Sequence, residues 1–330
     1  MTTKNESTYY NANSQQSRST EDILELKIPQ KYAGFRLDKA LSQILPENSR
    51  SRIQTWILEK RVTVDNLEAN SKNKIWGGES IKIRRTLNHN KTKNIAEPLQ
   101  LNIIYEDQSI LVINKPAGMV VHPGNGNWQG TMLNGLLHYS SELKEIPRAG
   151  IVHRLDKNTS GLLVVARSIE AQTNLVRQLQ SRTMKRDYFA LVHGNIEASG
   201  HVNAPIGRHP IQRIRMAVNK NGKNAHTSYL IKEQINGYTI LQCSLDTGRT
   251  HQIRVHMLSI GHSIVGDPIY GTKPQKASPE IRKLISNFPR QALHAEYLEL
   301  IHPDTNRKIM WKSELPEDIS ELLLKLRAAS

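Results

Sequence analysis

A polar, charged segment that runs directly into an apolar one places the strongest constraint on the fold. Residues 153–162 have the sequence HRLDKNTSGL, and the apolar residues 163–166 continue it. A β-branched apolar run of this kind predicts a buried strand. A charged loop must therefore lie at the end of that strand, with the carboxylate of Asp156 among a histidine, an arginine and a lysine. Such a site would hold a charged carboxylate next to an anionic ligand.

The charge balance points to a polyanionic partner. The 330 residues include 45 Lys and Arg against 30 Asp and Glu, which leaves a net charge of +15. An excess of this size favours a nucleic acid, because Lys and Arg gain affinity by neutralising phosphates. A charge that serves solubility alone is the competing explanation. The apolar fraction of 38% and the length fit a soluble protein of about two domains.

Neither secretion nor membrane insertion is predicted. Residues 1–22 are rich in Ser, Asn, Gln and Thr, and we expect a disordered arm here instead of a signal peptide. No stretch approaches the ~20 apolar residues that a membrane span needs. Cys243 is the single cysteine, so an intrachain disulfide is impossible. This suits a reducing compartment, and we expect a cytoplasmic protein.

Residues 23–86 are predicted to form a small domain of their own. An alternating segment indicates a first strand, two short helical patterns form a corner, and strands near 62–64 and 81–83 would pack on it. Residues 31–85 contain twelve basic and six acidic side chains. The candidates for RNA contact lie at or near the second helix: Arg50, Arg52, Lys60 and Arg61. A solvated helix face is the alternative explanation of this cluster.

The same segment resembles a known RNA-binding module. The runs RLDKAL at 36–41, SRIQ at 51–54 and KRVTVD at 60–65 are similar to the alpha-L (S4-type) domain, which is shared with a primary rRNA-binding ribosomal protein. The resemblance implies that the second helix and the following turn present a basic surface to structured RNA. It favours RNA over DNA as the polyanion.

A polar linker is expected at 87–98, followed by a larger domain at 99–328. The strand patterns of this domain are 101–105, 110–114, 162–166, 188–192, 228–232, 238–245 and 297–301. Its helical patterns are 169–180, 251–260 and 316–327. Because these elements follow no regular βαβ repeat, we predict an α+β fold with a mostly antiparallel sheet.

Two segments of this domain are candidates for binding a phosphate group. The glycine-rich loop at 120–126 begins a GxGxxxG spacing instead of the dinucleotide-binding GxGxxG, and no helix is predicted directly after it. We therefore assign this loop to turn formation. The helix at 251–260 has Thr250 as its predicted cap and Arg249 beside it, so its N-terminus is a candidate anion site.

The segment 153–162 also has features of other kinds of binding and catalytic site, which the sequence argues against. It starts like a calcium-binding loop, but the twelfth position is Arg167, where a bidentate glutamate must stand. An aspartyl-phosphate hydrolase needs a second carboxylate, and here Asn158 takes that position. His251 and His256 lack the glutamate of a zinc-binding HExxH pattern, and a glycosidase needs two carboxylates. An aspartate that acts on a nucleic-acid sugar or base remains, as does a surface loop with an ion pair.

The segment HRLDKNTSGL resembles the signature of the RluA family of RNA pseudouridine synthases. Residues 185–188, 247–257 and 291–295 agree with the family in order and spacing, as do 266–271. The common family form has an aspartate where this chain has Asn158. The resemblance implies a synthase domain on a mixed, bent sheet with flanking helices. It also implies isomerisation of a uridine in a stem-loop of large-subunit (23S) rRNA.

The resemblance further implies roles for individual residues. Asp156 would be the nucleophile, Tyr188 would stack on the uracil and could serve as base, and Arg254 would keep Asp156 ionised and aimed. Arg154 would fill the space left by the flipped base. Flipping costs roughly a few kcal/mol, which a stacking Tyr and an Arg guanidinium can offset. The other expected RNA contacts in this domain are His153, Arg249 and Gln252.

No metal or cofactor is expected, because the implied reaction has no redox step and no phosphate donor. The expected partner is RNA, as large-subunit rRNA or a pre-ribosomal particle, and the resemblance implies a monomer. Three alternatives stay open: a non-catalytic rRNA-binding assembly factor, a synthase for another RNA, and an aspartyl phosphotransferase that requires magnesium.

Overall fold

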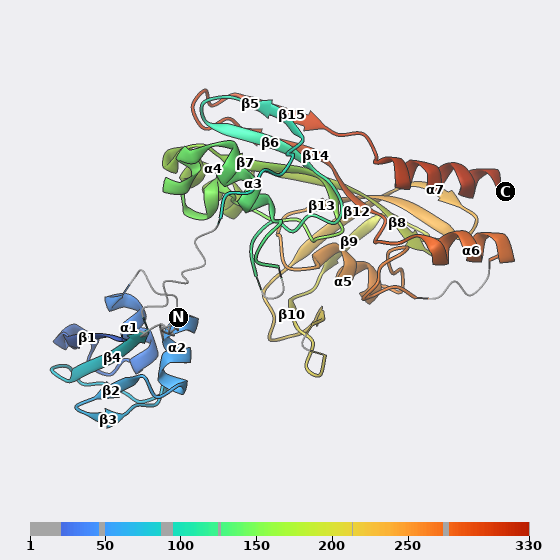
Figure 1. Cartoon of the computed structure of the whole chain (residues 1–330). Helices are drawn as coiled ribbons and strands as arrows, with labels where there is room; N and C mark the ends of the chain where they lie inside the picture. The colour runs from blue at the N-terminus through green and yellow to red at the C-terminus, as the bar shows by residue number, and fades with distance from the viewer. Residues whose placement is uncertain are drawn as a thin grey trace, which may run out of the picture. The chain divides into compact units, whose positions relative to one another are not determined.

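The chain folds into two compact units, residues 1–93 and 94–330 (Figure 1). The computed structural model describes residues 21–45, 50–86, 95–124, 127–212, 214–272 and 277–329, without the side chains of 21, 22, 51, 52, 85 and 86. The predicted arm lies outside the described residues except for Glu21 and Asp22, which begin the first strand. Most of the predicted linker lies outside them as well, and the boundary between the units falls within it.

The N-terminal unit is an antiparallel sheet with two helices. The strands follow the order β1-β4-β2-β3. The elements are β1 (Glu21–Lys27), η1 (Gln30–Tyr32), α1 (Leu37–Ile44), α2 (Arg50–Leu58), β2 (Val62–Val64), β3 (Leu67–Glu68) and β4 (Ser80–Thr86). Apolar side chains recur at helical spacing in α1 and alternate in β4, so Leu41, Ile81 and Ile83 enter one core. The predicted helix corner with its small sheet is confirmed.

The second unit is built on a nine-stranded sheet. Its order is β5-β6-β7-β14-β8-β13-β12-β9, and β15 pairs with β14. The strands are β5 (Ile103–Glu106), β6 (Ile110–Lys115), β7 (Ser160–Ala166), β8 (Lys185–His193), β9 (Gly200–Asn203), β12 (His226–Ile235), β13 (Tyr238–Leu245), β14 (Leu293–Ile301) and β15 (Lys308–Lys312). Among these described strands only β7 and β14 pair in parallel. The predicted mixed, mostly antiparallel sheet is confirmed, and β10 (Ile206–Arg208) and β11 (Met216–Val218) form a separate hairpin.

Helices cover both faces of this sheet. They are α3 (Met132–Tyr139), η2 (Ser141–Glu145), η3 (Pro147–Gly150), α4 (Ile169–Ser181), α5 (Gln252–Ser259), α6 (Pro279–Asn287) and α7 (Glu317–Ala328). Every residue of β7 is buried, because Leu163 and Val165 enter the larger core while Leu162 and Val164 pack with α4 on the other face. The charged loop before β7 is thus anchored by the best-protected strand of the sheet.

Two helix starts differ from the sequence predictions. We predicted no helix after the glycine-rich loop, yet α3 begins at Met132, where Thr131 and Asn134 form a reciprocal capping box. Helix α5 begins one residue later than predicted, because His251 and not Thr250 is its N-cap residue. The backbone of His251 is left-handed, with φ 57°, and its side chain makes no capping hydrogen bond.

Candidate active site

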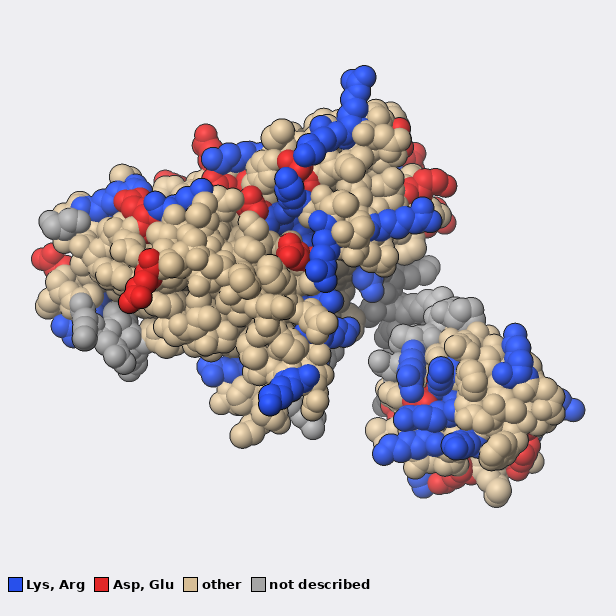
Figure 2. Space-filling view, turned by 180° about the vertical axis from the view of Figure 1, so that it is seen from behind, with Lys and Arg blue, Asp and Glu red and all other residues tan. Residues whose placement is uncertain are grey.

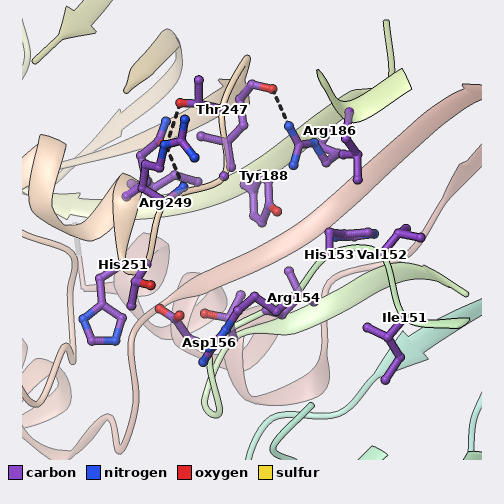
Figure 3. Close-up of a pocket in the computed structure, with 18 of the residues that line it drawn as sticks. Ile151, Val152, His153, Arg154, Asp156, Arg186, Tyr188, Thr247, Arg249 and His251 are labelled. Carbon is purple, nitrogen blue, oxygen red and sulfur yellow. Dashed lines mark hydrogen bonds between the residues drawn. The ribbon is translucent and has the colours of Figure 1, made fainter. Parts of the chain in front are cut away.

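A cleft of about 830 Å³ opens beside the loop that precedes β7 (Figure 3). It is lined by this loop, by β8, by the β13–α5 connection and by the start of α5. Asp156 lies in this cleft, in a turn that the Thr159 N–H closes by donating to the Asp156 carbonyl over 3.0 Å. Gly161 follows with φ 113°, and a Cβ there would lie 2.3 Å from the Ala295 carbonyl oxygen. Glycine is required because β7 approaches β14 closely at this point.

A buried arginine links Asp156 to a second carboxylate. Arg254 Nη1 lies 2.9 Å from Asp156 Oδ2. The other edge of its guanidinium meets Asp267, with Nε–Oδ2 at 2.7 Å and Nη2–Oδ1 at 2.8 Å. The Arg254 side chain is 3% exposed, that of Asp267 0%, and that of Asp156 16%. Asp267 therefore fixes the guanidinium, while Asp156 keeps an accessible carboxylate edge.

Arg254 and its carboxylate partners stabilise one another's charges. Burial works against the charged Arg254 guanidinium, but hydrogen bonds and the charge of Asp267, together with Asp156, raise the pKa of Arg254. Burial likewise opposes the charged form of Asp267, yet Arg254 and the backbone N–H groups of Tyr270 and Ile269 lower the pKa of that carboxyl. Arg254 and Asp267 are consequently charged at neutral pH.

A buried lysine supports the turn that holds Asp156. Lys115 Nζ donates to the carbonyl oxygens of Pro116 at 2.8 Å, Met119 at 3.0 Å and Lys157 at 3.1 Å. Its side chain is fully buried. Burial lowers the pKa of Lys115 to about 7, although the charge of Asp156 acts in the opposite direction. The three carbonyls match the three N–H groups of an ammonium and tie the turn to the loop after β6.

An aromatic ring and a second arginine lie above Asp156 in the cleft (Figure 3). Tyr188 is 5% exposed and sits in β8, flanked by β13 and β14, so its ring has a fixed position. Burial raises the pKa of the Tyr188 hydroxyl, and the charge of Arg186 opposes this shift. Tyr188 is therefore protonated at neutral pH. Arg186 is 7% exposed and donates from Nη2 to the Leu245 carbonyl over 3.2 Å.

The residues expected to contact RNA in this unit fall into two groups. Arg154 and Arg249 are exposed at the cleft, and Arg249 Nε donates to the Asn224 carbonyl over 3.1 Å. His153 is half-buried, and its Nε2 accepts from the Val164 N–H at 3.2 Å. Burial and then Arg186 lower the pKa of His153 to about 3, so the ring is neutral.

Gln252 lies in the wall of the cleft, but its amide is engaged within the protein. It is 3% exposed. Its Oε1 accepts from the Arg249 N–H at 2.9 Å and from the Thr247 hydroxyl at 2.8 Å. Its Nε2 donates to the His226 carbonyl and to the Thr227 hydroxyl. With its amide used on both sides, Gln252 fixes the turn before α5.

The basic residues of the N-terminal unit also differ in their surroundings. Figure 2 shows Lys and Arg side chains gathered on one face of this unit. Lys60 pairs with Glu68 at 3.0 Å, and Arg61 pairs with Glu59 at 2.9 Å, all with exposed or largely exposed side chains. The Arg52 side chain lies outside the described part of the chain.

Arg50 has a structural partner. Its Nη2 lies 2.9 Å from Asp38 Oδ2, and the Asp38 side chain is fully buried in α1. Gln54 Nε2 donates to the same carboxylate oxygen. Arg50 therefore joins α2 to α1, and its assignment as an RNA contact rests on the 48% of its side chain that stays exposed.

Sequence reasoning missed three residues of the cleft region: His251, Asp267 and Tyr270. Asp267 and Tyr270 belong to the segment GDPIYG at 266–271, whose only signal in the sequence is its agreement with the family. No spacing rule could connect them to Asp156, because the contact with Arg254 spans different elements. Among the described residues, no group of three or more His, Cys, Asp or Glu side chains is arranged to hold a metal ion.

Comparisons with known proteins agree on the two units. Residues 109–259 match the model of the family described as RNA pseudouridylate synthase, and residues 35–76 match the S4 domain. A curated relative from Nitrosomonas europaea, named ribosomal large subunit pseudouridine synthase D, is 54% identical over 94% of this chain and 90% of its own length. A relative of the same name from Yersinia pestis is 48% identical over 92% and 95%.

A solved structure shows the same fold. The chain described as human RNA pseudouridylate synthase domain containing 4 superposes with a TM-score of 0.55 at 25% identity, over 68% of this chain and 93% of that one. No helix in the described part of the chain is long and apolar enough to span a membrane.

Proposed function

This chain belongs to the RNA pseudouridine synthase family, and we propose that it isomerises uridine to pseudouridine in a stem-loop of large-subunit (23S) rRNA, with Asp156 as the nucleophile. The relatives support the rRNA target, since those at 54% and 48% identity bear the name of a large-subunit synthase. The S4 domain supports structured RNA as the substrate. We further propose that the protein works in the cytoplasm as a monomer and without a cofactor.

The main support for this proposal is the contact between the Asp156 carboxylate and Arg254. Arg254 is clamped by Asp267 on one edge and contacts Asp156 over 2.9 Å on the other. This arrangement pairs Asp156 with a fixed guanidinium and places its carboxylate in a cleft large enough for a flipped nucleotide. A carboxylate with one protected and one accessible oxygen can act on the sugar or on the base.

The reaction is a rearrangement within one nucleotide. The target uridine flips into the cleft, where its uracil stacks on Tyr188 while Arg154 takes its place in the RNA. Asp156 attacks the nucleotide or stabilises the sugar as the bond between uracil N1 and the ribose breaks. The detached uracil rotates, its C5 bonds to the same sugar carbon, and the proton on C5 is lost while N1 gains one. Tyr188 would have to give up its own proton before it could serve as the base.

An isomerisation assay tests the proposal. Wild type and Asp156→Asn are incubated with a transcript of a large-subunit rRNA stem-loop, and pseudouridine is read out by carbodiimide modification. We expect Asp156→Asn to fold and to bind the RNA but to form no pseudouridine. Asp187→Asn is the matched control, because Asp187 lies next to Tyr188 on β8 and its carboxylate accepts from Gln242 and Ser244.

Measurable isomerisation by Asp156→Asn would remove the catalytic assignment. Activity of the wild type on an unrelated RNA, but not on the rRNA stem-loop, would favour the alternative of a synthase for another RNA. The assay is repeated with a chelator, which we expect to have no effect, because an aspartyl phosphotransferase and not this reaction depends on magnesium.

A further inference from the structure

His251 occupies an unusual position on the wall of the cleft. It immediately precedes α5, and its left-handed backbone has φ 57°. Residues with a Cβ rarely adopt this conformation, and it persists only where the surroundings impose it. Its side chain does not cap the helix, which is the ordinary reason for a polar residue at this position. The position of His251 therefore calls for another explanation.

A chain of hydrogen bonds fixes the tautomer of His251. The Met216 N–H donates to Tyr270 Oη over 2.8 Å, and His251 Nδ1 lies 2.8 Å from the same oxygen. A backbone N–H can only donate, and the buried Tyr270 hydroxyl has Nδ1 as its acceptor among the described residues, so we infer that its hydrogen points to Nδ1. Burial lowers the pKa of His251, with Asp156 acting in the opposite direction. A neutral ring that accepts at Nδ1 carries its proton on Nε2.

The Nε2–H group of His251 is an available donor. It has no hydrogen-bond partner among the described residues, and it is not one of the polar atoms that the protein encloses. The ring lies near Asp156 in the cleft (Figure 3). Exposed Arg249 lies just before it in the chain, and exposed Arg154 lines the same cleft. These surroundings favour an anionic or oxygen-rich ligand over a nucleobase face.

We propose that His251 donates its Nε2–H to a sugar–phosphate oxygen of the target nucleotide, and that Tyr270 is the positioning residue that holds this tautomer. This inference rests on the proposed function, because it needs RNA in the cleft. Tyr270 is well placed for this role, since it is 3% exposed and its ring lies under the guanidinium of Arg254 at 5.0 Å. One buried side chain thus contacts both His251 and the partner of Asp156.

Two substitutions separate this role from a purely structural one. In His251→Gln the amide nitrogen reaches the place of Nε2, whereas in His251→Asn the amide matches Nδ1 and the residue suits a positive φ better. We measure the Kd of the rRNA stem-loop and the single-turnover rate for both. The proposal predicts that Gln binds within about two-fold of wild type and that Asn binds about ten-fold more weakly, the effect of one lost hydrogen bond. The proposal would be overturned if His251→Asn bound the RNA with wild-type affinity while His251→Gln bound it more weakly. It would also be overturned if both variants lost the same affinity.

The Tyr270→Phe variant tests the positioning role. It keeps the ring under the guanidinium of Arg254 but removes the hydroxyl, so RNA binding should weaken in the same direction as in His251→Asn. The double variant should bind no more weakly than His251→Asn alone, because both changes remove one interaction. Additive losses would overturn the coupling. Isomerisation by the wild-type protein tests the proposed function. The Kd values of the variants test the role of His251, and they can be ranked whether or not pseudouridine forms.

Discussion

Asp156 owes its position to a residue that it does not touch. Arg254 contacts Asp156 through one nitrogen, while Asp267 takes the other two. A guanidinium held at only one edge could turn within the cleft, and a misplacement of about 1 Å can lower a rate by about a hundred-fold. Asp267 is therefore as important for the geometry of the site as the residues that face the RNA.

Asp267→Asn should lower the single-turnover rate by about a hundred-fold. It should also lower the free energy of unfolding by about 3–5 kcal/mol, because the buried Arg254 guanidinium loses one of its two charged partners. Both are measured by rapid-quench kinetics and urea unfolding. Glu233→Gln is the control, because it breaks an exposed ion pair with Arg327. A folded Asp267→Asn protein with the wild-type rate would contradict this role.

At the level of residues, the sequence predicted those site residues that belong to a local motif. The segment around Asp156 could be recognised, and the resemblance implied the contact with Arg254 that the structure contains. The burial of Gln252 was not predicted, because a polar side chain next to two basic ones looks exposed in sequence although its amide is enclosed by Thr227 and Thr247. Asp267 escaped notice because nothing local distinguishes a buried carboxylate from an exposed one.

Among the elements, the strand β6 supports the candidate active site through its last residue, Lys115. Lys115 ends this strand and holds three carbonyl oxygens of the two loops beneath Asp156. Lys115→Met would leave these oxygens without a donor, and each unsatisfied group costs about 1–3 kcal/mol. We expect a loss of unfolding free energy of about 3 kcal/mol or more, measured by urea unfolding at pH 7.

The pH dependence of stability gives a second test of Lys115. In the folded protein its pKa is lowered to about 7, against about 10.4 for an ordinary lysine in the unfolded chain. Between these values the unfolded state binds more protons, so this group makes wild type more stable as the pH rises. Lys115→Met should lack that rise between pH 7 and pH 9. Parallel curves for the two proteins would contradict the buried, proton-releasing lysine.

The helix α2 and the turn after it give a prediction for RNA binding. Lys60 and Arg61 pair with exposed glutamates, and such pairs contribute little to stability. The double change Lys60→Gln and Arg61→Gln should weaken rRNA binding and reduce the slope of log K against log salt by about two. Arg50→Gln should instead destabilise the N-terminal unit, because buried Asp38 loses a partner. An unchanged slope in the double variant would contradict the RNA contact.

The elements with a clear hydrophobic pattern could be predicted, and those without one could not. The strands β6, β7 and β13 and the helix α7 carry strong patterns and lie where the sequence predicted them. Helix α3 was missed, because it contains Gly135, whose missing side chain lets Leu99 and Leu101 pack against the helix. The β10–β11 hairpin has three-residue strands, too short for a period to show.

For the whole molecule, the charge of +15 indicated a polyanion, and the family membership identifies it as RNA. The change of composition after residue 86 predicted a linker, and the division of the chain into two compact units falls after residue 93. Neither signal could have identified the reaction. That conclusion depends on the segment at 153–162 and on its relatives, because charge describes the partner and only the site describes the chemistry.

The proposed activity is tested by a carbodiimide map of pseudouridine in large-subunit rRNA from cells that lack this protein. We predict that one or more large-subunit pseudouridines disappear, that wild-type protein restores them, and that Asp156→Asn, expressed at the same level, does not. An unchanged map, or restoration by Asp156→Asn, would contradict it.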